Sequence, residues 1–338
     1  MRTIFQRWLL PAAALLALSE AAVAAGPVPV FNDGFETGDS CAWSVGPSSC
    51  LGPGFQFDTP EVIVGPGEEI TYCYYFHTPN AETIGIRRWA LTLGSVAHDV
   101  TLFATYDATH LPADREPAGT LSSTNCGFVD MGSSNTLANW AYAAHNPFEQ
   151  IVLPADDGAG SPLAVEVVAG QPMFLQMHFI NPTGVAIANT VRLAAEALEI
   201  GVGYTKTASY FTYNNSISIP ASSAGHTETR TCAAPAGVEF WFLSTHTHQF
   251  ATSASVRDGV IPLVQSADWE NPEILVFSSP GFYTFSPSGL TYECVYNNPT
   301  GSPIVSGNSP ISDENCVGIG YFFPATRPLL CIDNAGPF

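Results

Sequence analysis

The sequence predicts an all-β protein made of two jelly-roll-like antiparallel β-sandwich domains packed side by side. Its 29 glycines and 27 prolines divide the chain into short segments. Many of these segments are rich in β-branched and aromatic residues, and no long stretch shows the 3.6-residue period of an amphipathic helix. The 338 residues are enough for two domains of about 150 residues each.

Residues 1–25 have the pattern of a secretory signal peptide. Arg2 and Arg7 give a positive start, Trp8–Leu18 is an apolar run, and Ala22–Ala24 is a cleavage site of small residues. The apolar run is too short to cross a bilayer. We therefore expect a protein that is secreted or periplasmic, with no membrane partner.

Residues 26–54 form an acidic, turn-rich leader, similar to segments that follow the signal peptides of many exported bacterial proteins. We expect Cys41 and Cys50 to close a local disulfide loop in it, although an ordinary surface linker is the alternative. Eight cysteines in an exported chain favour disulfides over thiol catalysis.

Strand patterns occupy the rest of the chain and change over near Glu199–Gly203, so we expect domains at 55–199 and 200–338. Turn residues punctuate the strands at the spacing of a sandwich or barrel. The expected strands are Glu61–Val64, Glu69–Phe76, Ile84–Leu93, Val100–Tyr106, Leu163–Val168, Met173–Ile180, Val191–Leu198, Ser216–Ile219, Thr227–Cys232, Val238–His248, Ser253–Arg257, Ile274–Phe277, Thr291–Tyr296 and Val317–Phe323.

The net charge of −20 and the ten Lys plus Arg residues limit the possible partners. Such a surface repels nucleic acid and anionic membranes, and no basic stripe offsets it. We expect a small-molecule substrate instead.

The segment Phe240–His248 ends in a His-x-His pair on an expected strand. Residues i and i+2 of a strand share one face, so His246 and His248 should point the same way. Two imidazoles on a rigid strand supply most of a metal site. Alone, this motif is a weak signal, because most such pairs bind nothing specific.

Two other segments carry histidines next to polar residues. His98 and Asp99 precede an apolar strand, and His178 lies within a hydrophobic strand with Gln176 on its face. Taken singly, His98 and His178 would more often be hydrogen-bonded core or edge residues than ligands.

Together, these segments resemble the ascorbate-dependent type II copper monooxygenases, namely dopamine β-monooxygenase and the peptidylglycine hydroxylating monooxygenases. The resemblance covers the chain from about Phe55 to Ile332 and is best in Phe174–Pro182, Ser244–His248, Cys294–Asn298, Asp313–Cys316 and Tyr321–Pro324. It implies two copper sites across a solvent-filled cleft, one on each domain. One copper would pass electrons from ascorbate, and the other would bind dioxygen and hydroxylate a substrate C–H bond.

The resemblance also implies the metal ligands and the disulfides. The first site would use His98, Asp99 and His178, with Gln176 as a supporting residue, and the second would use His246, His248 and Asn315. The matching cysteine positions suggest the pairs Cys73–Cys126, Cys232–Cys331 and Cys294–Cys316.

Each implied site departs from the family pattern at one ligand. Asp99 stands where the family has a histidine, and carboxylate favours Cu(II) over Cu(I). A regular strand would point Asp99 away from His98, so its ligation requires an irregular backbone. Asn315 stands in place of a methionine and offers a harder oxygen. Met131 is a loose substitute, whereas Met173 and Met177 should face away from His178.

The residues that grip a peptide carboxylate in the family are also missing. Ser244 and Ile319 stand in place of the family's arginine and tyrosine. We therefore expect an apolar or aromatic small substrate rather than peptide amidation.

Three other interpretations remain open at this point. The chain could be a copper-binding relative without catalysis, a jelly-roll binding module without metal, or a mononuclear protein in which His98, Asp99 and His178 hold non-haem iron. A cupredoxin-like electron carrier is disfavoured, because it needs a free thiolate and the cysteines are expected to be paired.

Overall fold

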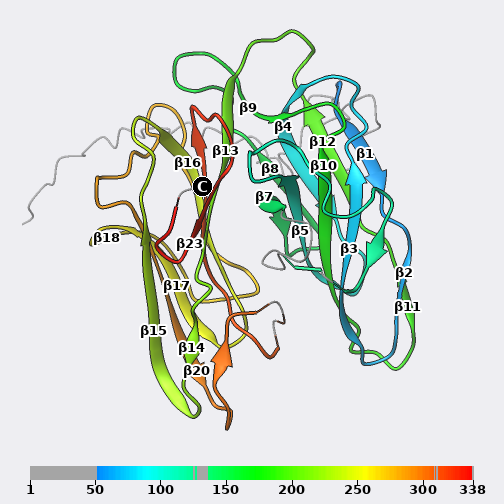
Figure 1. Cartoon of the computed structure of the whole chain (residues 1–338), viewed down its shortest axis with the longest axis vertical. Helices are drawn as coiled ribbons and strands as arrows, with labels where there is room; N and C mark the ends of the chain where they lie inside the picture. The colour runs from blue at the N-terminus through cyan, green and yellow to red at the C-terminus, as the bar shows by residue number, and fades with distance from the viewer. Residues whose placement is uncertain (1–51, 125, 128–135, 308, 310, 337–338) are drawn as a thin grey trace, which may run out of the picture.

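The computed structural model describes residues 52–336 except 125, 128–135, 308 and 310 (Figure 1). In this part of the chain the regular elements are strands and no α-helix is present, so the predicted all-β fold is confirmed. Accordingly, the described residues contain no helix that could cross a bilayer. The expected signal peptide, the pair Cys41 and Cys50, and Met131 all lie outside the described residues.

The first half of the chain forms a sandwich of two sheets, drawn from blue to green in Figure 1. One sheet has the order β6 (Leu121–Ser122), β3 (Glu69–His77), β10 (Pro172–Ile180), β5 (Ala97–Tyr106) and β7 (Leu137–Ala144). The other has the order β1 (Phe55–Asp58), β12 (Arg192–Ala197), β4 (Ile84–Thr92) and β9 (Leu163–Val167), with β8 (Phe148–Val152) also paired to β4.

The second half forms another sandwich beside the first. Its outer sheet has the order β15 (Ser223–Cys232), β20 (Leu290–Asn298), β17 (Ala251–Asp258) and β18 (Ile261–Ser266). Its inner sheet has the order β13 (Thr205–Tyr213), β22 (Cys316–Phe323), β16 (Glu239–Thr247) and β19 (Ile274–Val276), with β23 (Leu329–Ile332) paired to β13. Two short pairs join β2 (Val62–Val64) to β11 (Ile187–Asn189) and β14 (Ser218–Ile219) to β21 (Ile304–Val305).

A short parallel pairing connects the two halves. Thr205 of β13 lies opposite Leu163 of β9, so one sheet runs continuously from the first sandwich into the second. The expected boundary at residues 199 and 200 falls between β12 and β13. The halves therefore share backbone hydrogen bonds as well as side-chain packing.

Buried aromatic rings pack the two halves together. Trp140 of β7 lies with its ring 5.4 Å from that of Tyr321 of β22, and Tyr321 stacks on Trp241 of β16 at 4.8 Å. The hydroxyl of Tyr321 donates a hydrogen bond to the carbonyl oxygen of Ala141. Aromatic side chains bury large apolar areas, so this layer fixes how the two sandwiches face each other.

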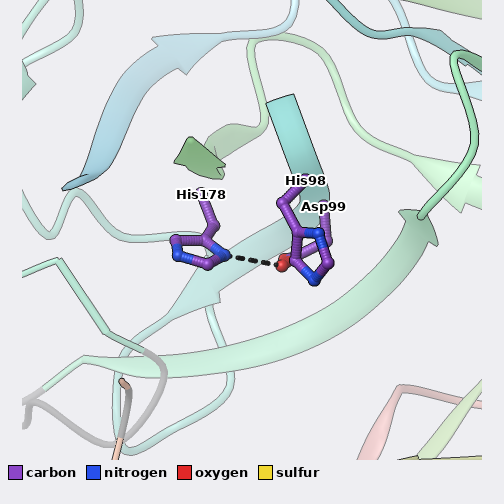
Figure 2. A group of neighbouring side chains, drawn as sticks. All are labelled: His98, Asp99 and His178. Carbon is purple, nitrogen blue, oxygen red and sulfur yellow. Dashed lines mark hydrogen bonds and ion pairs between the residues drawn. The ribbon is translucent and has the colours of Figure 1, made fainter. Parts of the chain in front are cut away.

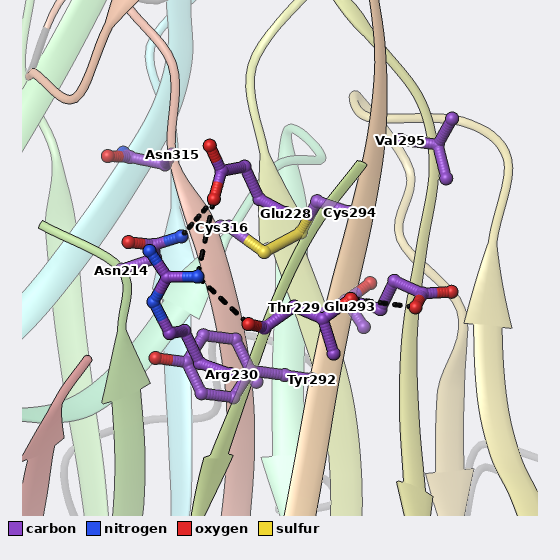
Figure 3. The surroundings of a disulfide bond; sticks show 12 residues. Asn214, Glu228, Thr229, Arg230, Tyr292, Glu293, Cys294, Val295, Asn315 and Cys316 are labelled. Atoms are coloured by element: carbon purple, nitrogen blue, oxygen red, sulfur yellow. Dashed lines mark hydrogen bonds and ion pairs between the residues drawn. A yellow bond between two sulfur atoms is a disulfide. The ribbon is translucent and has the colours of Figure 1, made fainter. Parts of the chain in front are cut away.

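All three disulfides implied by the resemblance are present: Cys73–Cys126, Cys232–Cys331 and Cys294–Cys316. The last pair joins β20 to the first residue of β22 (Figure 3). Asn315 directly precedes Cys316, and in Figure 3 its side chain points away from the sulfur atoms. Each cross-link typically stabilises a fold by about 2–4 kcal/mol, and this one also anchors the segment that presents Asn315.

Several strands were not among those expected from the sequence: β1, β6, β7, β8, β11, β13, β18, β21 and β23. In addition, β5 begins at Ala97 rather than at Val100, which brings His98 and Asp99 into the strand. Both differences affect the cavity between the halves.

Candidate metal centre

A cavity of about 210 Å³ lies between the two sandwiches. One wall comes from β3, β5, β7 and β10 of the first half, and the other comes mainly from β13, β16 and β22 of the second. Of the six residues expected to ligate metal, five line it: Asp99, His178, His246, His248 and Asn315. The sixth, His98, packs against His178, with the two ring centroids 5.4 Å apart.

A β-bulge brings His98 and Asp99 together. In the β5–β10 pairing, His178 lies opposite Asp99 but Phe179 lies opposite Ala97, which leaves His98 as an extra residue. Such a bulge changes the direction of side chains that a regular strand would send to opposite faces. One ligand atom from each of His98, Asp99 and His178 lies within 4.8 Å of the others (Figure 2). The irregular backbone that ligation by Asp99 requires is therefore present.

Glu69 supports this first cluster from β3. His178 contacts Asp99 Oδ2 through Nδ1 at 3.1 Å and Glu69 Oε1 through Nε2 at 2.9 Å. A carboxylate on the far nitrogen is the usual way to fix the orientation and tautomer of a metal-binding imidazole. No local pattern could predict this role, because Glu69 and His178 are 109 positions apart in the chain.

Charge interactions keep Asp99 ionised. Burial opposes ionisation of Asp99, but the hydrogen bond and charge of His178 outweigh it and hold the pKa of Asp99 well below its usual range. Burial likewise disfavours the charged form of His178, yet Asp99 and Glu69 together raise the pKa of His178. The first cluster thus offers an anionic oxygen beside two imidazoles, a set that suits Cu(II) or another divalent ion.

The second half of the molecule covers the first cluster. Trp269, in the segment between β18 and β19, lies with its ring 5.3 Å from that of His98. Burial lowers the pKa of His98. The cluster therefore faces the other sandwich rather than open solvent on this side.

The second cluster begins with His246 on β16 and His248 just after it. Their ring centroids are 5.4 Å apart and both side chains line the cavity, as the strand alternation predicts. Burial lowers the pKa of His246 to about 3 and that of His248 to about 4. Both imidazoles are therefore neutral at physiological pH, which is the form that binds metal.

The side chains of His248 and Asn315 are in direct contact. His248 Nδ1 lies 3.1 Å from the carbonyl oxygen of Asp313, so Nδ1 carries the proton and Nε2 has a free lone pair. The amide of Asn315 is best satisfied when its nitrogen donates to the carbonyl oxygens of Gly307 (3.0 Å) and Glu314 (3.2 Å). In that orientation its oxygen lies 2.9 Å from His248 Nε2.

A cation bound by both atoms would satisfy both lone pairs. A proton would do so only by charging His248, which burial opposes. Two ligands at about 2.0–2.2 Å from one ion and at a right angle are themselves about 2.9 Å apart. The 2.9 Å between Asn315 Oδ1 and His248 Nε2 is an ordinary hydrogen-bond distance, and it is also the spacing that two ligands of one metal ion would have.

Glu314 connects the two segments that carry the second cluster, namely the segment of His248 after β16 and that of Asn315 before β22. Its buried carboxylate accepts hydrogen bonds from the backbone N–H groups of His248 (3.0 Å), Phe250 (2.7 Å) and Asn315 (3.3 Å). Burial raises the pKa of Glu314 to about 7, against the effect of these donors. The carboxylate fixes the end of β16 against the start of β22.

The remaining lining residues set the character of the cavity. Gln176 lines it beside His178, and its Nε2 donates to the carbonyl oxygen of Cys126 at 3.2 Å. Met173 and Met177 are buried on the other face of β10 and do not line it. Among the described residues, no lysine or arginine lines the cavity, whereas aromatic and aliphatic side chains do: Phe103, Trp140, Phe211, Phe242, Pro272, Ile274, Val317 and Ile319.

No protein-family model and no curated protein matches the sequence. Among solved structures, the chain is similar to the major capsid protein P2 of bacteriophage PM2, at 10% identity and a TM-score of 0.33, covering 80% of this chain and 97% of that one. It is also similar to a peptide-N(4)-(N-acetyl-β-D-glucosaminyl)asparagine amidase, at 8% identity and a TM-score of 0.33, covering 79% and 95%. A third similar structure is the PBSX exported protein XepA, at 9% identity and a TM-score of 0.20, covering 82% and 89%. At these TM-scores the similarities carry no information about function.

Proposed function

We propose that this chain is an exported copper-dependent oxidoreductase that hydroxylates a C–H bond of a small substrate with dioxygen and an ascorbate-type reductant. The observation that carries the proposal is the convergence of two ligand clusters, from opposite sandwiches, on one cavity. Bound copper would supply the one-electron chemistry and the binding of dioxygen. The ligand types fit copper, since imidazole nitrogen and oxygen donors both bind Cu(II).

The protein's own groups would position these ligands and the substrate. Glu69 fixes the ring of His178, and Glu314 fixes the backbone of His248 and Asn315. The apolar wall beside the second cluster, which includes Phe242 and Ile319, favours a neutral apolar or aromatic substrate. A carboxylate substrate would find no cationic side chain among the described lining residues.

One observation favours a second candidate, a copper-binding protein without hydroxylase activity. Asn315 presents a hard amide oxygen, and its amide nitrogen has two carbonyl acceptors that keep it in place. An oxygen donor stabilises Cu(II) relative to Cu(I). Such a site would bind Cu(II) well, but the bound copper would be difficult to reduce to Cu(I).

Copper content and ascorbate-driven oxygen uptake separate these candidates. We expect the purified exported protein to bind two copper ions per chain and to consume oxygen with ascorbate faster than the same concentration of free copper. Copper binding without oxygen uptake above that control would favour the non-catalytic candidate. A protein that binds no copper would refute both candidates and leave a metal-free binding module.

A further inference from the structure

His145 is a fourth histidine that lines the cavity, beside His178, His246 and His248, and it belongs to neither of the two expected ligand sets. It follows β7 directly, in the turn that leads to β8 of the first half. Its ring centroid lies 6.0 Å from that of His246, which belongs to the second half. The Oε2 atom of Glu149 accepts the backbone N–H groups of His145 (2.9 Å) and Asn146 (3.2 Å), so the turn is anchored.

The spacing between His145 and His246 is in the range for two ligands of one ion. With metal–nitrogen bonds of about 2.0–2.1 Å, two imidazoles on the same ion have ring centroids roughly 5–6 Å apart. The pairs His246–His248 and His98–His178 both have a spacing of 5.4 Å. Of the three other histidines that line the cavity, the one whose ring contacts that of His145 is His246.

We propose that His145 is a third imidazole ligand of the centre formed by His246, His248 and Asn315, contributed across the cavity by the opposite sandwich. This inference rests on the proposed function, because it assumes that this centre binds copper. Three imidazoles and one amide oxygen make a four-coordinate set, and the additional nitrogen offsets the weak oxygen of Asn315.

Ligation requires a small movement of the His145 side chain. Among the described residues, His98, Asp99 and His178 form the one group of three His, Cys, Asp or Glu side chains whose ligand atoms lie within 4.8 Å of one another. The ligand atoms of His145, His246 and His248 are therefore farther apart than this in the structure. His145 is partly exposed and lies on a turn, so it can change rotamer without disturbing the core. Bound metal would then join the two sandwiches and stabilise them against separation.

The test isolates the second centre. In a His98→Ala/His178→Ala background, which removes both imidazoles of the first cluster, we would compare His145→Phe with the parent. Phenylalanine keeps a ring of similar size but has no nitrogen donor. His145→Gln is a second variant in case phenylalanine perturbs folding, and thermal unfolding of the metal-free proteins checks the fold.

The matched control is His226→Phe, which removes a partly buried histidine of β15 that pairs with Glu228 away from the cavity. We expect His145→Phe to weaken Cu(II) binding at least about tenfold and to reduce the imidazoles counted by pulsed electron paramagnetic resonance from three to two. The control should change neither quantity. If the parent showed two imidazoles and His145→Phe left the affinity unchanged, the role of His145 would be refuted while the second centre would stand. If the parent bound no copper, the second centre itself would be refuted.

Discussion

Replacing His248 with alanine should weaken copper binding at the second centre by about 100-fold or more. Substituting a residue that only orients a metal ligand typically lowers metal affinity by about 10–100-fold. Loss of a ligand itself should therefore lower the affinity by at least as much. His248 is buried, neutral and aligned by Asp313, and its Nε2 faces the Asn315 oxygen. Titration calorimetry and metal analysis of the dialysed protein would measure the loss, which should be close to one copper ion per chain.

His226→Ala is the appropriate control, because it removes a histidine outside the cavity. Metal-free His248→Ala should keep the all-β circular dichroism spectrum of the parent, since the three disulfides and the aromatic layer remain. If His248→Ala retained full copper content with unchanged affinity, the His-x-His pair would not be a metal site, and the metal-free binding module would become the better interpretation.

Substituting Asn315 with methionine should raise Cu(I) affinity by about tenfold, or roughly 1.4 kcal/mol, and increase ascorbate-driven oxygen uptake. A thioether is a soft donor that favours Cu(I), whereas the amide oxygen favours Cu(II). The substitution also removes the amide hydrogen bonds to Gly307 and Glu314. The carbonyl oxygen of Glu314 keeps the backbone N–H of Gly307 as a donor at 3.2 Å, so the loss falls on the carbonyl oxygen of Gly307. An acceptor left without a partner costs up to about 1–3 kcal/mol when buried, so the variant should be less stable to heat.

The measurement compares wild type and Asn315→Met at equal copper loading, with Cu(I) affinity determined by a chromophoric competitor. Asn315→Leu has similar bulk but no donor atom, and it separates the effect of the sulfur from the loss of the amide. Rapid oxygen uptake by the wild type, with no gain in the methionine variant, would show that Asn315 belongs to a working site of different design.

The fold class could be predicted from sequence because strand patterns and turn residues are local signals. The strands that were missed have weak local signals. The segment of β7, Leu137–Ala144, is rich in alanine and lacks clear alternation, and alanine is depleted in strands. It is a strand because it pairs with β5 and packs Trp140 against Tyr321, contacts that no local pattern reveals. Missing β7 also hid the position of His145.

The sequence pointed to the residues that gather at the candidate site but not to the residues that hold them in place. The resemblance pointed to His98 and Asp99, yet the bulge that joins them depends on pairing with β10. Glu69 and Trp269 reach the first cluster from distant parts of the chain. Glu314 stands beside Asn315 in sequence, but its three backbone partners become evident only in the folded structure.

We propose above that two metal ions bind in one cavity between the sandwiches. Anomalous diffraction at the copper absorption edge, from crystals of the copper-loaded protein, tests it most directly. We expect one peak bounded by His98, Asp99 and His178, and a second bounded by His246, His248 and Asn315. Absence of any anomalous peak in the cavity, at a copper concentration that saturates the protein in solution, would contradict it.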